Sequence, residues 1–173
     1  MLIAVVGASG VGKDTLLDRS RVALQDDQRF RWARRVITRP AEAGGEDHDA
    51  VTEAEFLLRR FALSWSAHGL RYGITEADGA AALVGHRVVA NLSRAILAEA
   101  ATRFPLRVVN ITLPDSLRAA RLAARGREDV ADIAARLSRV APLPPGLNII
   151  EIVNDGSAAE GAARLVAALT AEG

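Results

Sequence analysis

A glycine-rich loop directly after an apolar run is the feature that most constrains this chain. Residues 2–6, LIAVV, have the length and composition of a buried parallel strand. They lead into GASGVGKDT, in which Gly7, Gly12 and Lys13 have the spacing of a phosphate-binding loop. Glycines let the backbone curl so that successive amide N–H groups face an anion, and the following helix adds its N-terminal dipole. We therefore predict a strand–loop–helix unit that binds nucleotide phosphates.

The loop departs from its usual pattern at the position after the lysine. A Ser or Thr hydroxyl there would ligate Mg²⁺, but this chain has Asp14. A carboxylate is a hard oxygen donor that can also hold magnesium, directly or through a water, and the neighbouring Thr15 offers a hydroxyl. An acid on the first helical turn also suits the helix dipole without any metal. The residues alone leave a metal site at Asp14 and Thr15 and a purely structural role both open.

Composition and charge narrow the class of protein. A chain of 173 residues, half of them hydrophobic, suits one domain with a substantial core. The net charge of +1 gives no reason to expect nucleic-acid or membrane-surface binding. The chain has no cysteine, which excludes disulfides and thiolate metal sites. Residues 2–6 are too short for a signal peptide or a membrane span, so we expect a cytoplasmic protein.

Predicted strands and helices alternate along the chain. We expect strands at 2–6, 31–38, 86–91, 106–113 and 148–153, with two short strands over 61–74 that are joined at His68-Gly69. We expect helices at 13–24, 52–60, 92–103, from 114 with a return to 140, and at 158–169. This order predicts an α/β fold, in which a parallel sheet is flanked by helices on both faces.

Further motifs follow in order over nearly the whole chain. They are Thr38-Arg39-Pro40, Gly44-Gly45-Glu46, Trp65 to Gly69, Tyr72-Gly73, Pro114 to Leu117, Arg125 to Asp129 and Val153 to Asp155. In this order they resemble the guanylate kinase family. The resemblance implies a P-loop NTPase fold of the nucleoside monophosphate kinase kind, as one domain over 1–173. It also implies a core at 1–36 and 84–173, a small substrate lobe at about 37–83 and an arginine-bearing lid at about 121–136.

The chain departs from guanylate kinases in its substrate lobe. Glu42 replaces a second arginine that clamps the GMP phosphate, and Ser64 replaces the glutamate that reads the guanine edge. Asn91 and Ser93, followed by Arg94, replace two aspartates. A site without its base reader should not prefer guanine. A site that is less negative can accept a substrate with an additional phosphate, because like charges repel strongly in a low-dielectric cleft.

One branch of the family carries these changes. The chain resembles the ribose 1,5-bisphosphate phosphokinases of phosphonate breakdown at Gly7–Asp14, Ile37–His48 and Val89–Arg94, and this branch carries the aspartate after the lysine. The resemblance implies that ATP and ribose 1,5-bisphosphate give ADP and 5-phosphoribosyl 1-diphosphate (PRPP), with ATP and Mg²⁺ as cofactors. The acceptor is a phosphate oxygen that is already anionic, so no general base is needed.

The resemblance also implies roles for individual residues. The donor nucleotide is expected at Gly7, Ala8, Ser9, Gly10, Val11, Gly12, Lys13, Asp14 and Thr15, with Asn154 and Asp155 at the adenine. Phosphoryl transfer is expected to use Lys13, Arg125, Arg127 and Arg136, and the acceptor to bind Arg39, Glu46, His48, Tyr72, Asn91, Ser93 and Arg94.

Structural readings stand beside these roles. Glu46 and His48 also fit a solvated loop, Arg125 and Arg127 a charged surface turn, and Arg136 an amphipathic helix. Asn154 and Asp155 also fit a cap on the last helix. The histidines His68 and His86 and the tryptophans Trp32 and Trp65 are expected to be structural.

Two other functions remain as alternatives at this point. One is a guanylate kinase or other nucleoside monophosphate kinase. The other is a non-catalytic guanylate-kinase-like binding module, although such modules typically lose the phosphate loop. We expect small-molecule partners only, with no nucleic acid or membrane, in a monomer or homodimer.

Overall fold

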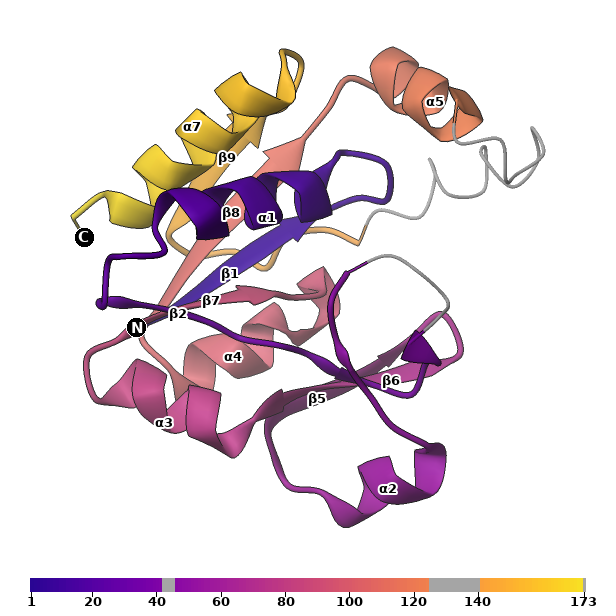
Figure 1. Cartoon of the computed structure of the whole chain (residues 1–173), viewed down its shortest axis with the longest axis vertical. Helices are drawn as coiled ribbons and strands as arrows, with labels where there is room; N and C mark the ends of the chain where they lie inside the picture. The colour runs from indigo at the N-terminus through magenta and orange to yellow at the C-terminus, as the bar shows by residue number, and fades with distance from the viewer. Residues whose placement is uncertain (42–45, 125–140, 173) are drawn as a thin grey trace.

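A parallel sheet forms the centre of the computed structural model, which describes residues 1–41, 46–124 and 141–172 (Figure 1). Its five strands lie in the order β2-β7-β1-β8-β9, and every pairing is parallel. Their bounds are β1 (Leu2–Gly7), β2 (Phe30–Trp32), β7 (Arg87–Asn91), β8 (Leu106–Thr112) and β9 (Ile149–Val153). β1 lies in the middle, so the phosphate loop begins at the carboxyl edge of the sheet.

A smaller mixed sheet carries the residues expected in the substrate lobe. Its order is β4-β3-β6-β5, with β3 (Val36–Ile37), β4 (Asp49–Ala50), β5 (Phe61–Ala67) and β6 (Leu70–Thr75). β5 and β6 form the predicted hairpin, whose turn has a φ of 53° at His68 and 72° at Gly69. The single strand predicted over 31–38 is wrong. Phe30 to Trp32 pair with β7 and Val36 to Ile37 pair with β6, so the chain changes sheets between them.

Helices cover both faces of the parallel sheet, as predicted. Figure 1 shows α1 and α7 together over one face, and α3 and α4 over the other. The helices are α1 (Lys13–Ala23), α2 (Glu53–Leu58), α3 (Glu76–Leu83), α4 (Leu97–Arg103), α5 (Asp115–Ala124) and α7 (Ala158–Thr170). Among the described residues, no helix is long and apolar enough to cross a membrane.

Two sequence expectations about helices need correction. The helix predicted over 92–103 begins later, because Ser93 caps a 3₁₀ turn, Arg94–Ile96, that precedes α4. The cap of α7 is Ser157, which forms a capping box with Glu160, so the alternative capping role of Asn154 and Asp155 does not hold. A further helix, α3, was not predicted.

The alternating side chains of β1 divide the core in two. Ile3 and Val5 pack in one cluster with residues of α1 and α7, whereas Leu2, Ala4 and Val6 pack in the other. The second cluster also contains residues of both strands of the β5–β6 hairpin and of α3 and α4. The lobe therefore shares one hydrophobic core with the parallel sheet, which fixes its position relative to the phosphate loop.

The packing of α7 gives a stability prediction with a matched control. Leu165 in α7 is 0% exposed, whereas Leu58 in α2 is 88% exposed. We expect Leu165→Ala to lower the free energy of unfolding by about 2–5 kcal/mol because it leaves a cavity. Leu58→Ala should change it by less than about 0.5 kcal/mol. Urea unfolding followed by circular dichroism measures both, and equal losses would contradict this description of the core.

Candidate functional site

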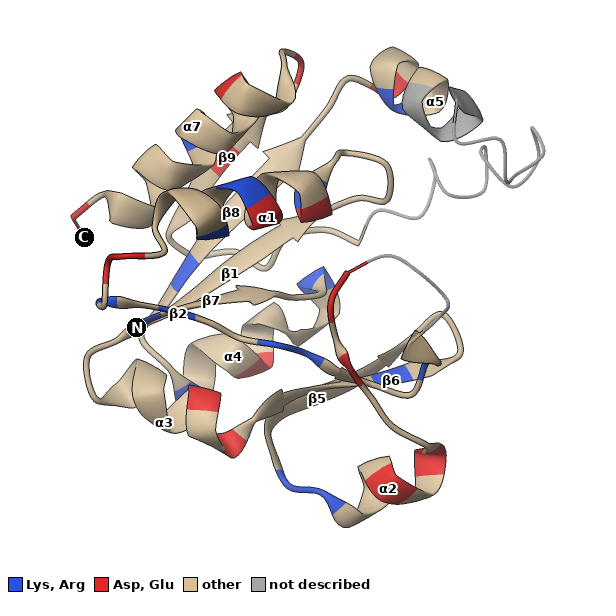
Figure 2. Ribbon diagram, in the orientation of Figure 1, with Lys and Arg blue, Asp and Glu red and all other residues tan. Residues whose placement is uncertain are grey.

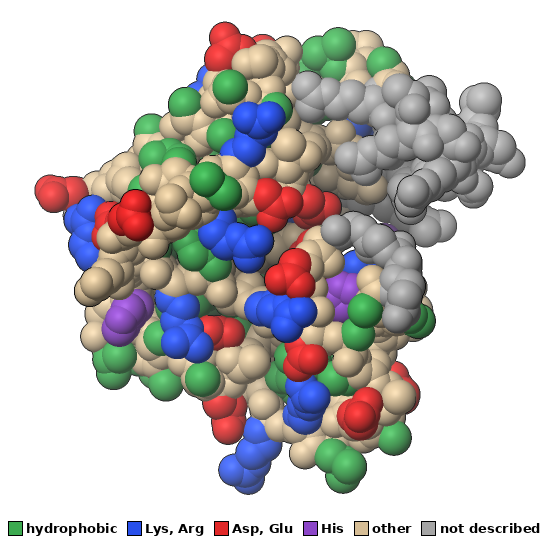
Figure 3. Space-filling model, in the orientation of Figure 1, with side chains coloured by type: hydrophobic (Ala, Val, Ile, Leu, Met, Phe, Trp, Pro, Cys, Tyr) green, Lys and Arg blue, Asp and Glu red, His purple; other side chains and the backbone are tan. Residues whose placement is uncertain are grey.

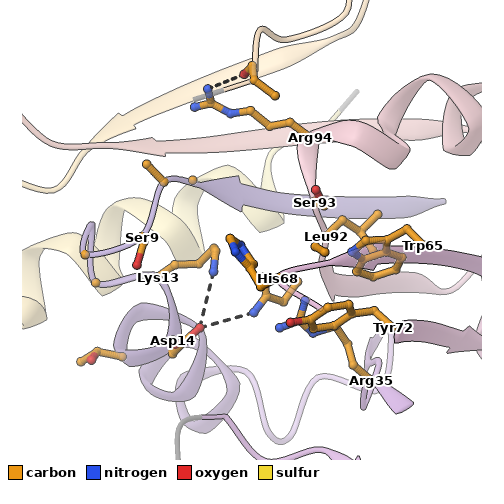
Figure 4. Close-up of a pocket in the computed structure, with 18 residues that line it drawn as sticks. Ser9, Lys13, Asp14, Arg35, Trp65, His68, Tyr72, Leu92, Ser93 and Arg94 are labelled. Carbon is orange, nitrogen blue, oxygen red and sulfur yellow. Dashed lines mark hydrogen bonds and ion pairs between the residues drawn. The ribbon is translucent and has the colours of Figure 1, made fainter. Parts of the chain in front are cut away.

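A cavity of about 400 Å³ lies where the phosphate loop faces the β5–β6 hairpin (Figure 4). Its described lining comes from three segments and two isolated positions. They are the phosphate loop and the start of α1 (Gly7, Ala8, Ser9, Gly10, Gly12, Lys13, Asp14, Thr15), the hairpin (Trp65, Ala67, His68, Tyr72), the end of β7 and the next turn (Asn91, Leu92, Ser93, Arg94), and the isolated positions Arg35 and Ala141. The fold thus brings most of the predicted donor and acceptor residues to one cavity.

Local geometry requires glycine at two positions of the phosphate loop. A Cβ on Gly7 would lie 2.6 Å from the carbonyl oxygen of Ile111 in β8, so only glycine allows this close approach. Gly12 has a φ of 87° immediately before α1. The side chain of Val11 is buried in the core, and its carbonyl oxygen accepts a 2.7 Å hydrogen bond from Asn154 Nδ2. Asn154 therefore holds the backbone of the phosphate loop through this hydrogen bond.

Lys13 extends into the cavity from the first turn of α1 (Figure 4). Its side chain is only 16% exposed, and Nζ lies 3.5 Å from Asp14 Oδ1. Burial lowers the pKa of Lys13 below its ordinary value; the Asp14 carboxylate opposes this shift, and the nearby Arg35 guanidinium adds to it. The lysine is thus a desolvated cation that gains from the arrival of an anion.

Asn91 connects the start of α1 to Glu46, in the segment expected to form the substrate lobe. Its Nδ2 donates to Glu46 Oε2 at 2.8 Å and lies 3.3 Å from Asp14 Oδ1. The other oxygen of Glu46 accepts hydrogen bonds from Nε and Nη2 of Arg35, the first at 2.8 Å. A continuous series of polar contacts therefore runs from Asp14 at the start of α1 to Arg35, the residue before β3.

The oxygen donors of Asp14 and Thr15 fit a magnesium ion that also binds phosphate oxygens. Asp14 is 53% exposed at its side chain, and Asp14 and Thr15 both line the cavity. Within the described residues, no three metal-binding side chains cluster. Mg²⁺ usually keeps several waters and takes one or two carboxylates plus phosphate oxygens, so a closed protein cage is not required.

An aromatic pair forms the opposite wall. The rings of Trp65 and Tyr72, cross-strand neighbours in the hairpin, stack with centroids 5.4 Å apart and planes 8° from parallel. His68, at the hairpin turn, lines the same cavity. Trp65 and His68 were expected to be structural, so sequence reasoning missed them. The register of Trp65 opposite Tyr72 was the signal that could have found the tryptophan.

Arg94 and Ser93 close a third side of the cavity. Arg94 Nη1 donates to the carbonyl oxygen of Ala141, and Nη2 donates to Asn110 Oδ1, both at 2.9 Å. Burial lowers the pKa of Arg94, and the Glu151 carboxylate opposes this shift. The guanidinium is therefore held in place before any ligand binds.

Three predicted acceptor residues lie off the cavity wall. The ring nitrogens of His48 lie 3.0 Å from the backbone carbonyl oxygens of Glu46 and Arg39, so the buried imidazole ties this loop together. Arg39 Nη2 lies 3.4 Å from His48 Nδ1, and Arg39 Nε is buried with no hydrogen-bond partner among the described residues. Glu46 faces a smaller hollow of about 60 Å³ beside Asp14 and Asn91.

The remaining predicted residues also lie away from the cavity or outside the described residues. Asp155 forms a surface ion pair with Arg164 at 3.1 Å. Arg125, Arg127 and Arg136, expected in the lid, lie outside the described residues, as does Glu42.

The lowered pKa of Lys13 gives a prediction for stability against pH. At pH values below the lowered pKa, Lys13 is charged in both the folded and the unfolded state, and burial of this charge lowers the free energy of unfolding. As the pH rises from the lowered pKa to the ordinary 10.5, the buried lysine is neutral, and this loss of stability disappears. Lys13→Met removes the charge and should be more stable than the parent near neutral pH. The difference should shrink toward pH 10.5. Urea unfolding across this range measures it, and a variant that is less stable at neutral pH would contradict the burial argument.

Known proteins are similar to this chain over nearly its whole length. The ribose 1,5-bisphosphate phosphokinase of Methylobacterium radiotolerans is 48% identical, covering 98% of this chain and 97% of its own. The protein of the same name from Acidiphilium cryptum is 51% identical, covering 81% of this chain and 77% of its own. The bifunctional ribose 1,5-bisphosphokinase-thymidine phosphorylase of Azorhizobium caulinodans is 47% identical over 97% of this chain, which spans only 25% of that longer protein. No protein-family model matches the chain.

Solved structures confirm the fold. The guanylate kinase of Anaplasma phagocytophilum superposes with a TM-score of 0.65 at 16% identity, covering 98% of this chain and 84% of its own. A gluconokinase from Sinorhizobium meliloti gives 0.55 at 17% identity, covering 96% and 90%. These likenesses establish the α/β architecture of the P-loop kinases. Because the sequence identities to the Methylobacterium and Acidiphilium proteins extend over most of both chains, this chain belongs to the ribose 1,5-bisphosphate phosphokinase family.

Proposed function

We propose that the protein transfers the γ-phosphoryl group of ATP to the 1-phosphate of ribose 1,5-bisphosphate. The observation that carries this proposal is the charge of the cavity wall. Among the described lining residues, Lys13, Arg35 and Arg94 are cations, and Asp14 is the only carboxylate. A wall of this kind suits two polyanionic substrates bound at once, because each cation offsets repulsion between their phosphates.

The face of the molecule drawn in Figure 3 does not show the same bias. Basic and acidic side chains are interspersed on it, as they are along the ribbon in Figure 2. That face therefore carries no extended positive patch. This distribution supports a small polyanion rather than an extended one as the ligand.

The reaction balances without an acid or a base. An anionic oxygen of the 1-phosphate attacks the γ-phosphorus of ATP, one P–O bond forms, and the bond to the β–γ bridging oxygen breaks. The products are ADP and 5-phosphoribosyl 1-diphosphate, the activated ribose made in phosphonate breakdown by the resembled enzymes. Because no proton must be removed from the acceptor, catalysis rests on positioning and charge neutralisation.

Residues of the chain supply both the positioning and the charge neutralisation. The amide N–H groups of the phosphate loop and Lys13 hold the β- and γ-phosphates of the donor. Asp14 and Thr15 would hold Mg²⁺, which when bound neutralises charge that develops on the phosphate oxygens. Tyr72, Ser93 and Arg94 line the opposite part of the cavity, where the acceptor must lie to be in line with the γ-phosphate.

A comparison of acceptors tests the proposed function. ADP release from ATP and Mg²⁺ is measured with ribose 1,5-bisphosphate and with GMP, and the product is identified by mass spectrometry. We expect 5-phosphoribosyl 1-diphosphate from the first acceptor and little turnover of the second. Rapid turnover of GMP alone would instead make the protein a guanylate kinase, and no transfer to either would support a binding module.

Lys13→Met should lower kcat with ribose 1,5-bisphosphate by about 100- to 1,000-fold, because it removes a cation aimed at charge that develops during transfer. Arg19→Ala is the matched control, since it removes an exposed cation from the same helix outside the cavity. The control should keep parental turnover. Similar rates in parent and Lys13→Met would contradict the role given to the phosphate loop.

Asp14→Ala should raise the Mg²⁺ concentration needed for half-maximal rate by about tenfold or more, because it removes a carboxylate that orients the ion. Asp18→Ala removes an exposed carboxylate one turn further along α1 and should leave the Mg²⁺ dependence unchanged. Magnesium titrations at saturating ATP measure both. If the two variants behave alike, Asp14 serves only the helix dipole.

A further inference from the structure

Arg35 occupies a position in the cavity that no sequence motif marked. It lies between β2 and β3, in the segment where the chain passes from one sheet to the other. Its side chain is only 14% exposed, yet it lines the cavity together with Lys13 (Figure 4). The adjacent Arg34 is exposed, pairs with Asp47 at 2.8 Å and does not line the cavity. Of these two neighbouring arginines, only Arg35 can meet a ligand there.

Contacts on two sides fix the plane of the Arg35 guanidinium. Nε and Nη2 donate to Glu46 Oε1, and Cζ lies 5.0 Å from the ring centroid of Tyr72 and 5.9 Å from that of Trp65. The cation–π contacts and the two hydrogen bonds to Glu46 together leave the group little freedom to rotate. A guanidinium held in this way loses little entropy when it binds an anion.

Arg35 still has donors to offer. Nη1 forms no hydrogen bond to any described residue, whereas Nε and Nη2 are bonded to Glu46. Glu46 also accepts from Asn91, so its negative charge is shared between two donors. The positive charge of Arg35 helps to lower the pKa of Lys13, so the two cations repel each other. An anion placed between them would be attracted by both.

The other arginines of the site are placed differently. Arg94 lines the cavity but is anchored to Ala141 and Asn110 through Nη1 and Nη2, and Arg39 lies beside His48, off the cavity wall. The resemblance to guanylate kinases had pointed to Arg39 for the acceptor phosphate. In this chain the cavity wall at that end is built from Arg35, Trp65 and Tyr72.

We propose that Arg35 is a binding residue of the acceptor subsite and that it holds a phosphate group of the phosphosugar through Nη1. Glu46 and the aromatic pair position the guanidinium for this contact. The proposal rests on the proposed function for the identity of the acceptor. The anion subsite itself depends only on the geometry around Arg35.

Equilibrium binding tests this subsite apart from catalysis. Isothermal titration calorimetry of the full chain with ribose 1,5-bisphosphate, and separately with ATP and Mg²⁺, compares the parent with Arg35→Lys. The lysine keeps the charge but loses the fork and the stacking. We expect the Kd for ribose 1,5-bisphosphate to rise about 10- to 100-fold and the Kd for ATP to stay within about twofold.

Two further variants keep the test decisive. Arg34→Lys is the matched control at the adjacent exposed position and should bind both ligands as the parent does. The double variant Arg35→Gln with Glu46→Gln removes both charges, so that weaker acceptor binding cannot come from an unpaired Glu46. It should also lose acceptor affinity by about 10-fold or more.

Three outcomes would overturn the proposal. The first is unchanged acceptor affinity in both Arg35 variants. The second is an Arg39→Lys variant that alone loses acceptor affinity, which would show that Arg39 binds the acceptor phosphate. Weakened ATP binding with unchanged acceptor binding would place Arg35 at the donor. If the parent binds and phosphorylates GMP instead, the proposed function fails, and GMP then serves as the probe of the same subsite.

Discussion

Burial of β1 on both faces is the constraint on which the rest of this structure depends. Each side chain from Leu2 to Val6 enters one of two hydrophobic clusters, so the strand can neither shift nor slip by one residue without exposing apolar surface. The loop that follows is thereby fixed at the carboxyl edge of the sheet, which is where open α/β folds place their ligands. The same strand also anchors the lobe, because one of its two clusters includes the β5–β6 hairpin.

On this rigid frame, the polar groups of the site form one connected system. Asp14, Asn91 and Glu46 link the start of α1 to Arg35 at the edge of the lobe. Both carboxylates of this system, Asp14 and Glu46, face donors, so their charges are compensated before a ligand arrives. The cavity still has an excess of cations, which a phosphorylated ligand would neutralise. The same excess of cations would therefore attract a phosphorylated ligand and be neutralised by it.

Much of this arrangement could be predicted from sequence, for identifiable reasons. The phosphate loop depends on local chemistry: glycines, a lysine and the dipole of the next helix. Strand–helix alternation indicated a parallel sheet, and the Thr52–Glu55 capping box marked the start of α2 correctly. These features depend on residues close together in the chain, so periodicity and turn chemistry reveal them.

The features that escaped prediction depend on long-range contacts. Residues 31–38 look like one strand, and only pairing with β7 and β6 shows that they belong to two sheets. Arg35 is one of many arginines, and its cation–π contact with Tyr72 depends on a hairpin that lies far along the sequence. Arg39 matched a family motif, yet its contact with His48 takes it off the cavity wall. A motif identifies a residue type at a position and leaves its side-chain direction open.

The hydrogen bond from Asn154 to the carbonyl of Val11 has a thermodynamic consequence. It makes the curl of the phosphate loop depend on the segment between β9 and α7, which lies at the other end of the described chain. Local opening of that last strand–helix unit would release the loop, and a nucleotide that holds the loop would oppose the opening. The two equilibria are then linked, and each must stabilise the other by the same free energy. A ligand bound at the phosphate loop would therefore also stabilise the final β–α unit.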